Sequence, residues 1–432
     1  MLIRAFLLVS LGAASLSMAR ADDWTQWRGP KRDGKSAEKG FGPWPKDGPK
    51  LLWSAEKLGT GYGSPAVVGD TLYLLGGDSP KDIAPEHVVA LNVKDGKEKW
   101  RTTINASPTG PDNLKKMFST WGAGTRATPT VDGDFLYVLS STGDVACMAR
   151  ADGKLVWTKN LVKDFEGGVP TWGYSESVLI DGDALVCTPG GKGGMVALNK
   201  KTGAVIWQCK EIGEGAGYSS IIAADIHGVR QYIQQTMAHG IGVRAKDGKL
   251  LWKAGEIARR VAVIPTPVVA DNHVFFTSGY NAGCELYKLE ADGDGTKAEK
   301  VYSKNSVVAN HHGGVIELGG YIYGHSDSKS WVCFDYKKGD DTPVWSSNKL
   351  DKGSIVYADG HFYCYGQAKG VLVKIKATTE GWEEVGRFTI PKTSSIRPSQ
   401  GLVWTHPVIA NGKLYLRDYD LLYCYDLGQP GA

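Results

Sequence analysis

The feature that most constrains the fold is a segment that recurs along the chain as a strand, a tight turn and a second strand ending on tryptophan. The first copy, ALNVKDGKEKW, runs from Ala90 to Trp100. Further copies are Cys147 to Trp157, Ala197 to Trp207 and Gly242 to Trp252. Each carries Asp-Gly or Thr-Gly starting five residues before the tryptophan. Four copies at one spacing are an internal repeat.

A second pattern precedes this segment and completes the repeating unit. In GSPAVVGDTLYLL, starting at Gly63, and ATPTVDGDFLYVLS, starting at Ala127, apolar runs flank a Gly-Asp turn, as in a β-hairpin. One unit therefore holds four short antiparallel strands. Weaker copies of the hairpin start at Ser177, Thr266, Gly314, Ser354 and His406, and a more degenerate one spans Ser220 to Ile233. The sequence thus predicts eight units.

The position that closes each unit is aromatic in all but one of them. Those positions are Trp53, Trp100, Trp157, Trp207, Trp252, Tyr302 and Trp345, with Val385 expected in the slot of the seventh unit. They recur every 40 to 57 residues, a period that fits four-stranded propeller blades. We identify no 3.6-residue periodicity and expect no helix.

The two ends of the chain complement each other. The eighth unit stops after Leu427 without a fourth strand, whereas Asp47 to Trp53 forms a lone strand before the first hairpin. Pairing them would remove an open sheet edge. We therefore predict an all-β fold, an eight-bladed β-propeller of four-stranded antiparallel blades closed by an N-terminal strand. The propeller spans residues 47–427, between an N-terminal arm (22–46) and a short tail (428–432). Each repeat tryptophan should lie between blades, with its indole N–H bonded to a carbonyl.

The first 21 residues have the pattern of a secretory signal peptide. An early arginine, an apolar run and a small-residue end at Ala19-Arg20-Ala21 predict cleavage after Ala21. The apolar run, Ala5 to Leu16, is too short to span a bilayer, and no later segment is long enough. Asp22 follows the cut, so a lipid anchor is not expected. We expect a periplasmic or secreted protein without a transmembrane segment. The formal charge of +4, spread along the chain, does not indicate nucleic acid.

The repeat Ala-Leu-Asn-x-x-Asp/Thr-Gly-Lys/Ala-x-x-Trp resembles the tryptophan-docking repeat of the PQQ-like β-propellers, over about residues 51–427. The resemblance is strong in blades one to four and weaker in blades five to eight. It implies an eight-bladed propeller and says less about chemistry. Quinoprotein alcohol dehydrogenases share this propeller, and so does the propeller subunit of the outer-membrane protein assembly machinery.

In those dehydrogenases the quinone is held between a tryptophan and a disulfide of adjacent cysteines, with calcium bound by carboxylate and amide oxygens. No two cysteines are adjacent here, so no cofactor is predicted, and PQQ with calcium belongs only to an alternative enzyme reading. The cysteines are Cys147, Cys187, Cys209, Cys284, Cys333, Cys364 and Cys424. Cys147, Cys333 and Cys424 fall in the slot of Ala90, so we interpret them as small apolar residues. Pairing among the other four is left open.

Loops that precede the inner strands should gather at one mouth of the channel, which makes this mouth the candidate ligand site. The residues expected there are Tyr62, Arg126, Tyr174, Glu176, Tyr218, Arg260, His312 and His406. Their chemistry suits an anionic or polyhydroxylated ligand. We expect no metal site at His311, His312 and His406, because neighbouring side chains in an extended chain point in opposite directions. Trp121 and Trp172, both in Thr-Trp-Gly, are interpreted as repeat packing.

Two further segments are given structural interpretations. Trp24 and Trp27 are expected to fold the arm under the propeller. The Asp-Gly-Asp-Gly segment at 292–295 is interpreted as a hairpin turn, since it lacks the glutamate of a calcium loop.

The sequence therefore predicts a monomeric, non-catalytic binding or scaffolding module of the cell envelope. Its partner would be an envelope protein or a small polar ligand. One alternative is a quinone-dependent dehydrogenase of alcohols or sugars, and another is an outer-membrane protein assembly factor. The sequence does not identify the ligand.

Overall fold

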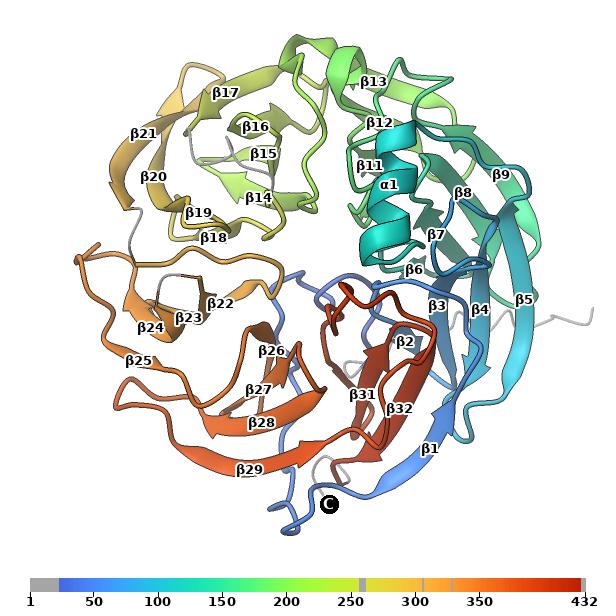
Figure 1. Ribbon diagram of the computed structural model, residues 1–432. Coiled ribbons are helices and arrows are strands. Elements are labelled where there is room, and N and C mark those ends of the chain that lie inside the picture. Colours follow the sequence, from blue (N-terminus) through green and yellow to red (C-terminus); the bar gives the residue numbers. More distant parts are fainter. Residues whose placement is uncertain (1–22, 256–261, 305–306, 328, 429–432) are drawn as a thin grey trace, which may run out of the picture.

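Eight antiparallel sheets of four strands are arranged in a ring in the computed structural model, as Figure 1 shows. The structure describes residues 23–255, 262–304, 307–327 and 329–428. Blades one to four contain β2 (Ala66–Val68), β3 (Thr71–Gly77), β4 (Glu86–Asn92), β5 (Glu98–Asn105), β6 (Thr130–Asp132), β7 (Phe135–Leu139), β8 (Asp144–Ala149), β9 (Leu155–Asn160), β10 (Leu179–Asp181), β11 (Ala184–Cys187), β12 (Met195–Asn199), β13 (Val205–Cys209), β14 (Ile222–Ile226), β15 (Val229–Gln235), β16 (Gly240–Arg244) and β17 (Leu250–Ala254).

Blades five to eight complete the ring. They contain β18 (Val268–Ala270), β19 (His273–Ser278), β20 (Gly283–Asp292), β21 (Gly295–Lys304), β22 (Val315–Leu318), β23 (Tyr321–Ser326), β24 (Ser330–Asp335), β25 (Trp345–Ser347), β26 (Gly353–Ala358), β27 (His361–Gly366), β28 (Val371–Lys376), β29 (Glu384–Thr389), β30 (Val408–Ala410), β31 (Lys413–Asp418) and β32 (Leu421–Asp426). The predicted eight-bladed fold is confirmed.

The ring is closed by strands from both ends of the propeller. Strand β1 (Leu51–Ala55) pairs antiparallel with β32 and becomes the fourth strand of blade eight. Trp53 lies opposite Cys424 in this pairing. The predicted closure by an N-terminal strand is therefore confirmed, and it joins the first and last blades through backbone hydrogen bonds.

The apolar core lies between neighbouring blades rather than at the centre of the ring. Separate buried clusters join blades one and two, two and three, three and four, four and five, five and six, and six and seven. One larger cluster unites blades seven, eight and one. Because each blade buries both faces in this way, every blade depends on its two neighbours.

The repeat tryptophans lie where adjacent blades meet. The indole N–H groups of Trp157 and Trp207 donate to the carbonyls of Lys200 and Ala245 in the next blade, at 3.0 and 2.9 Å. Trp53 and Trp345 make the same bond, to Val93 and Thr378. The predicted interblade position and carbonyl bond are thus confirmed for these four residues. Trp252 instead donates to the side chain of Gln231 in its own blade, and no described residue accepts from the indole of Trp100.

The turn glycine of the repeat has a steric reason. A Cβ atom added to Gly248, whose φ is +74°, would lie 2.6 Å from the ring of Trp207. Glycine therefore lets the turn of one blade lie flat on the tryptophan of the preceding blade. The residue opposite the tryptophan is small for a similar reason, since Cys147 pairs with Trp157 and Cys333 with Trp345. The interpretation of these cysteines as small apolar residues is confirmed, and all seven cysteines are buried and unpaired.

Blade seven departs from the prediction. Lys374 pairs with Gly386 and Ile375 with Glu384, so Val385 lies in the bulge and Gly386 takes the tryptophan slot. The assignment of Val385 to that slot is therefore wrong. Trp44 of the arm fills the space instead, because a Cβ atom on Gly386 would lie 2.6 Å from its ring.

One helix breaks the all-β pattern. Helix α1 (Asp112–Trp121) lies between β5 and β6 and buries Leu114 and Phe118. The expectation of no helix was wrong, although Leu114, Met117, Phe118 and Trp121 recur at helical spacing. In Figure 1 the helix lies in front of the ring near its centre. Within the described residues, no helix is long and apolar enough to cross a membrane. The predicted signal peptide lies outside the described residues.

The insertion in blade five is a hairpin, as predicted. Asp292 pairs with Gly295 across the turn that joins β20 and β21.

Candidate functional site

The loops that precede the inner strands of blades one and two meet backbone to backbone at one mouth of the channel. Gly61 bridges Thr125, and the N–H of Tyr62 donates to the Thr125 carbonyl at 2.9 Å. A Cβ atom on Gly124 would collide with a backbone carbonyl of the blade-one loop, so glycine permits this close approach. As a result, Tyr62 and Arg126 lie beside each other.

Arg126 is enclosed by aromatic rings. Its guanidinium carbon lies 5.2, 5.6 and 5.7 Å from the ring centres of Tyr62, Phe118 and Trp172. Its N–H groups donate to three loop carbonyls at 3.2 to 3.3 Å. Burial lowers the pKa of Arg126, whereas nearby groups including Glu86 raise it. The Glu86 oxygens, however, accept hydrogen bonds from Ser141. The cation is therefore held by rings and neutral carbonyls.

Three half-buried tryptophans line the same mouth. The ring of Trp121 lies 5.9 Å from that of Trp172 and 6.3 Å from that of Trp404. Trp404 donates its indole N–H to Gln367, but no described residue accepts a hydrogen bond from the indoles of Trp121 or Trp172. Trp121 ends α1 whereas Trp172 lies in a loop, so the two are not equivalent packing residues of the repeat. Their interpretation as repeat packing is corrected to a contact at the mouth.

Of the histidines in this region, His312 and His406 are buried and His311 is half buried, and burial lowers the pKa of all three. His312 lies 6.2 Å from Trp404 and 5.3 Å from His311, ring centre to ring centre. The expectation that these adjacent histidines point apart is wrong, because their rings meet edge to face. His406 lies deeper, donates from Nε2 to the His312 carbonyl at 2.9 Å and contacts Trp27. Burial lowers the pKa of His406 to about 3.

Two residues expected at the mouth are engaged within the ring wall. Tyr174 is 1% exposed and donates its hydroxyl to the carbonyl of Pro189 at 2.8 Å. Glu176 accepts a hydrogen bond from the N–H of Thr188, and burial raises its pKa to about 7. These contacts join the loop before β10 to the segment after β11, and neither side chain is part of the group around Arg126.

Two residues predicted at the mouth remain, Tyr218 and Arg260. Tyr218 is buried and lies close enough to Arg126 to influence its charge. Arg260 lies outside the described residues. The structure therefore groups Tyr62, Arg126 and Tyr218, and Trp404 links this group to His312. Ligand binding by these residues stays a prediction.

Below the mouth, the N-terminal arm fills the channel. Trp24 pairs with Val67 of blade one through two backbone hydrogen bonds of 2.8 Å. Trp27 donates its indole N–H to Thr266 of blade five at 2.8 Å. In Figure 1 the arm, drawn in blue, runs from the middle of the ring to its rim. The expected packing through Trp24 and Trp27 is confirmed, with the difference that the arm enters the channel.

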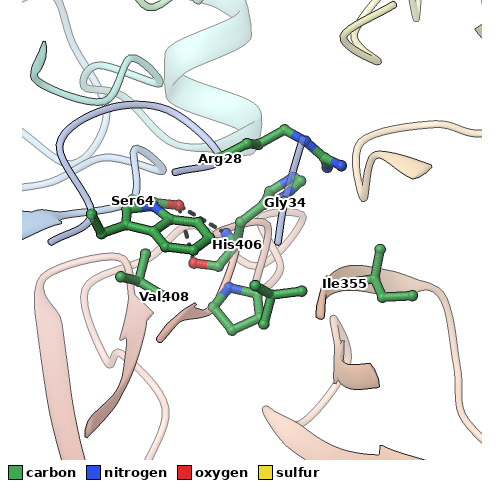
Figure 2. A pocket seen from close by; sticks show the side chains of 9 residues that line it. Arg28, Gly34, Ser64, Ile355, His406 and Val408 are labelled. Carbon is green, nitrogen blue, oxygen red and sulfur yellow. Dashed lines mark hydrogen bonds between the residues drawn. The ribbon is translucent and has the colours of Figure 1, made fainter. Parts of the chain in front are cut away.

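Two buried arginines anchor the arm. Arg28 donates to the carbonyl of Val315, and Arg32 donates to those of Ser177 and Val178, at 2.5 to 3.1 Å. Burial lowers the pKa of both guanidinium groups to about 10. Arg28, His406 and Ser64 line a cavity of about 10 Å³. Such a volume holds at most one water molecule. Figure 2 shows these side chains from close by.

The sequence did not indicate three residues that shape the mouth and the channel, namely Trp404, Arg28 and Arg32. Trp404 precedes the inner strand of blade eight, in a loop where only His406 was singled out. Arg28 and Arg32 bind backbone carbonyls, and such bonds leave no pattern of complementary charges in the sequence.

Comparisons with known proteins agree with this architecture. A family model described as outer membrane protein assembly factor BamB matches residues 46–120 and 115–347. The BamB of Xanthomonas campestris pv. campestris is 24% identical over 208 residues, which cover 48% of this chain and 44% of the relative. The chain thus spans less than half the length of this curated relative.

Solved structures share the fold at low sequence identity. BamB from Moraxella catarrhalis has a TM-score of 0.59 and 14% identity, covering 88% of this chain and 99% of that one. A quinohemoprotein alcohol dehydrogenase from Comamonas testosteroni has a TM-score of 0.60 and 12% identity, covering 96% and 82%. At these identities the likeness concerns the fold alone. Since the family model matches well over half of its residues, the chain belongs to the family described as outer membrane protein assembly factor BamB.

Proposed function

We propose that this protein is an exported, non-catalytic scaffold that acts in the assembly of outer membrane proteins in the cell envelope. Its family membership supports this role, as do relatives that carry the name of such a factor. The predicted signal peptide supports export. The partner would be a protein of the envelope.

The observation that carries the proposal is the filled channel. The arm buries Trp24, Arg28 and Arg32 against strands of several blades, and the cavity left beside Arg28 is about 10 Å³. Within the part of the chain that the structure describes, the arm therefore crosses the path through the ring. The surfaces left for recognition are the mouth and the outer strands, as expected of a protein that binds partners.

The mouth does not fit a quinone with calcium. All seven cysteines are buried and unpaired, so none supplies the adjacent disulfide of the quinoprotein dehydrogenases. Arg126 is surrounded by rings and backbone carbonyls, and the carboxylate of Glu86 is bonded to Ser141. We assign no catalytic step to the site. Added quinone and calcium should give no oxidation of alcohols or aldoses, and turnover that a chelator abolishes would contradict this proposal.

The assembly role is tested by deleting the gene in the native host and measuring the abundance of β-barrel proteins in the outer membrane. We expect several of them to decrease and to recover when the wild-type gene is restored. A matched control restores a gene that encodes Trp207→Ala, which should recover less because the ring is destabilised. Unchanged outer-membrane protein levels in the deletion strain would contradict the proposal.

A further inference from the structure

Arg126 forms no ion pair with any residue that the structure describes, so its positive charge at the mouth of the channel has no bonded carboxylate. Its three hydrogen bonds go to neutral carbonyls at 3.2 to 3.3 Å, which is long for an arginine. The rings of Tyr62, Phe118 and Trp172 hold the guanidinium group in place. An anion that reached Arg126 would replace these long hydrogen bonds to neutral carbonyls with shorter bonds between two ions.

Further hydrogen-bond donors lie next to this charge. The indole N–H groups of Trp121 and Trp172 donate to no described residue, and both rings are half buried. In contrast, the other tryptophan of the mouth, Trp404, is bonded to Gln367 at 3.1 Å. The group around Arg126 therefore offers donors and flat apolar surface together.

The same contacts disfavour a polyhydroxylated ligand. The hydroxyl of Tyr62 donates to the Trp121 carbonyl at 2.6 Å, and that of Tyr419 donates to the carbonyl of Pro80 at 2.8 Å. Because both hydroxyl hydrogens are engaged, neither tyrosine donates to a sugar hydroxyl. The carboxylate that acts on Arg126, that of Glu86, is bonded to Ser141 inside the wall. The guanidinium group and the indole N–H groups of Trp121 and Trp172, which donate to no described residue, thus favour an anion.

We propose that the mouth of the channel binds a carboxylate carried on an aromatic group, with Arg126 receiving the carboxylate and the rings of Trp121 and Trp172 contacting the aromatic part. The ligand is either a free aromatic acid or the C-terminal residue of a polypeptide that ends in an aromatic side chain. This site is separate from the assembly role, which can hold or fail without it.

The test compares ligands that differ only in charge. Binding of N-acetylphenylalanine and of its amide to the folded mature protein is measured by calorimetry, and indole NMR signals report the location. We expect the acid to bind roughly 10- to 100-fold more tightly than the amide, because a hydrogen bond between charged groups is lost. The signals of Trp121 and Trp172 should move. A short peptide ending in phenylalanine, with a free or amidated end, distinguishes a polypeptide end from a free acid.

Variants then locate the charge. Arg126→Gln should weaken binding of the acid about tenfold or more and leave binding of the amide unchanged. Arg387→Gln is the matched control, since Arg387 pairs with Glu384 on an outer strand and should behave as wild type. Should Arg126→Gln fail to fold, the difference between acid and amide in the unaltered protein still decides. Equal binding of acid and amide, or no binding of either acid or peptide, would overturn the proposal.

Discussion

Trp207 and Trp172 are close in sequence, yet their indole groups have different surroundings. Trp207 is 9% exposed, donates to the carbonyl of Ala245 at 2.9 Å and lies flat against Gly248. Trp172 is half buried at the mouth, has no hydrogen-bond acceptor among the described residues, and faces the Arg126 guanidinium.

The difference shows what makes a tryptophan structural in this ring. At Trp157, a turn glycine of the next blade packs against the face of the indole, and a backbone carbonyl of the same blade accepts a hydrogen bond from its N–H. Where neither is present, as at Trp121 and Trp172, the ring is half buried and its N–H has no acceptor among the described residues. The ring and the mouth should therefore respond differently to the same substitution.

The largest effect is expected from opening the ring. Deletion of residues 47–55 removes β1 and Trp53, exposing the edge of β32. Exposed edges recruit other chains, so we expect aggregation and loss of a cooperative unfolding transition. Light scattering measures the aggregation, and urea unfolding shows whether the transition is still cooperative. Removal of residues 428–432, which follow β32, is the control. A monomeric deletion variant of unchanged stability would show that the closing strand is dispensable.

The second test makes the same change in both regions. Trp207→Ala should lower the free energy of unfolding by about 3–5 kcal/mol, since it removes a large buried side chain. Trp172→Ala should change it by less, about 1 kcal/mol, because this half-buried ring loses contacts with Arg126 and Trp121 but no hydrogen bond from its indole. Denaturant unfolding measures the free energy of unfolding of both variants and of the wild type. Equal losses would mean that the mouth is as structural as the ring.

The third test concerns Trp44, which takes the place of the missing docking tryptophan in blade seven. Trp44→Ala should cost about 3 kcal/mol, the lower end for a large aromatic residue, because Trp44 is only partly buried. Adding Gly386→Trp should recover part of the loss by restoring a docking tryptophan, as the φ of Gly386 is not in the positive range. Thermal and denaturant melts compare the two variants. A double variant no more stable than Trp44→Ala would show that Trp44 does not replace the missing residue.

The smallest expected effect is a pH dependence of the free energy of unfolding that arises from Glu86, which lies in the wall below the mouth. Burial raises the pKa of Glu86 from 4.5 to about 7. A carboxyl group whose pKa is raised by folding stabilises the protein below the unfolded pKa, and this contribution is lost as pH rises through the folded pKa. Between pH 5 and pH 7, wild type should therefore lose about 2 kcal/mol relative to Glu86→Gln.

Comparing these two proteins cancels the buried histidines, whose lowered pKa values act in the opposite direction. A constant stability difference across this pH range would show that Glu86 is charged throughout.

The repeat made most of the fold predictable, because spacing between Trp100, Trp157, Trp207 and Trp252 reports a local requirement for a turn glycine and a large ring. The substitution of Trp44 for a residue opposite Lys374 was not predictable, since the two segments are far apart in sequence. The mouth was predicted only as a set of loops. Which side chains face Arg126 depends on packing between blades, so Tyr174 turned into the wall while Trp404 joined the mouth.

Exchange of the indole N–H protons with solvent tests the contrast between ring and mouth most directly, and NMR measures it for every tryptophan in one sample. We predict slow exchange at Trp53, Trp157, Trp207 and Trp345, whose N–H groups are bonded to carbonyls of the next blade. Trp121 and Trp172 should exchange fast and become protected when an aromatic acid is added. Equal protection at both sets in the free protein would contradict the account.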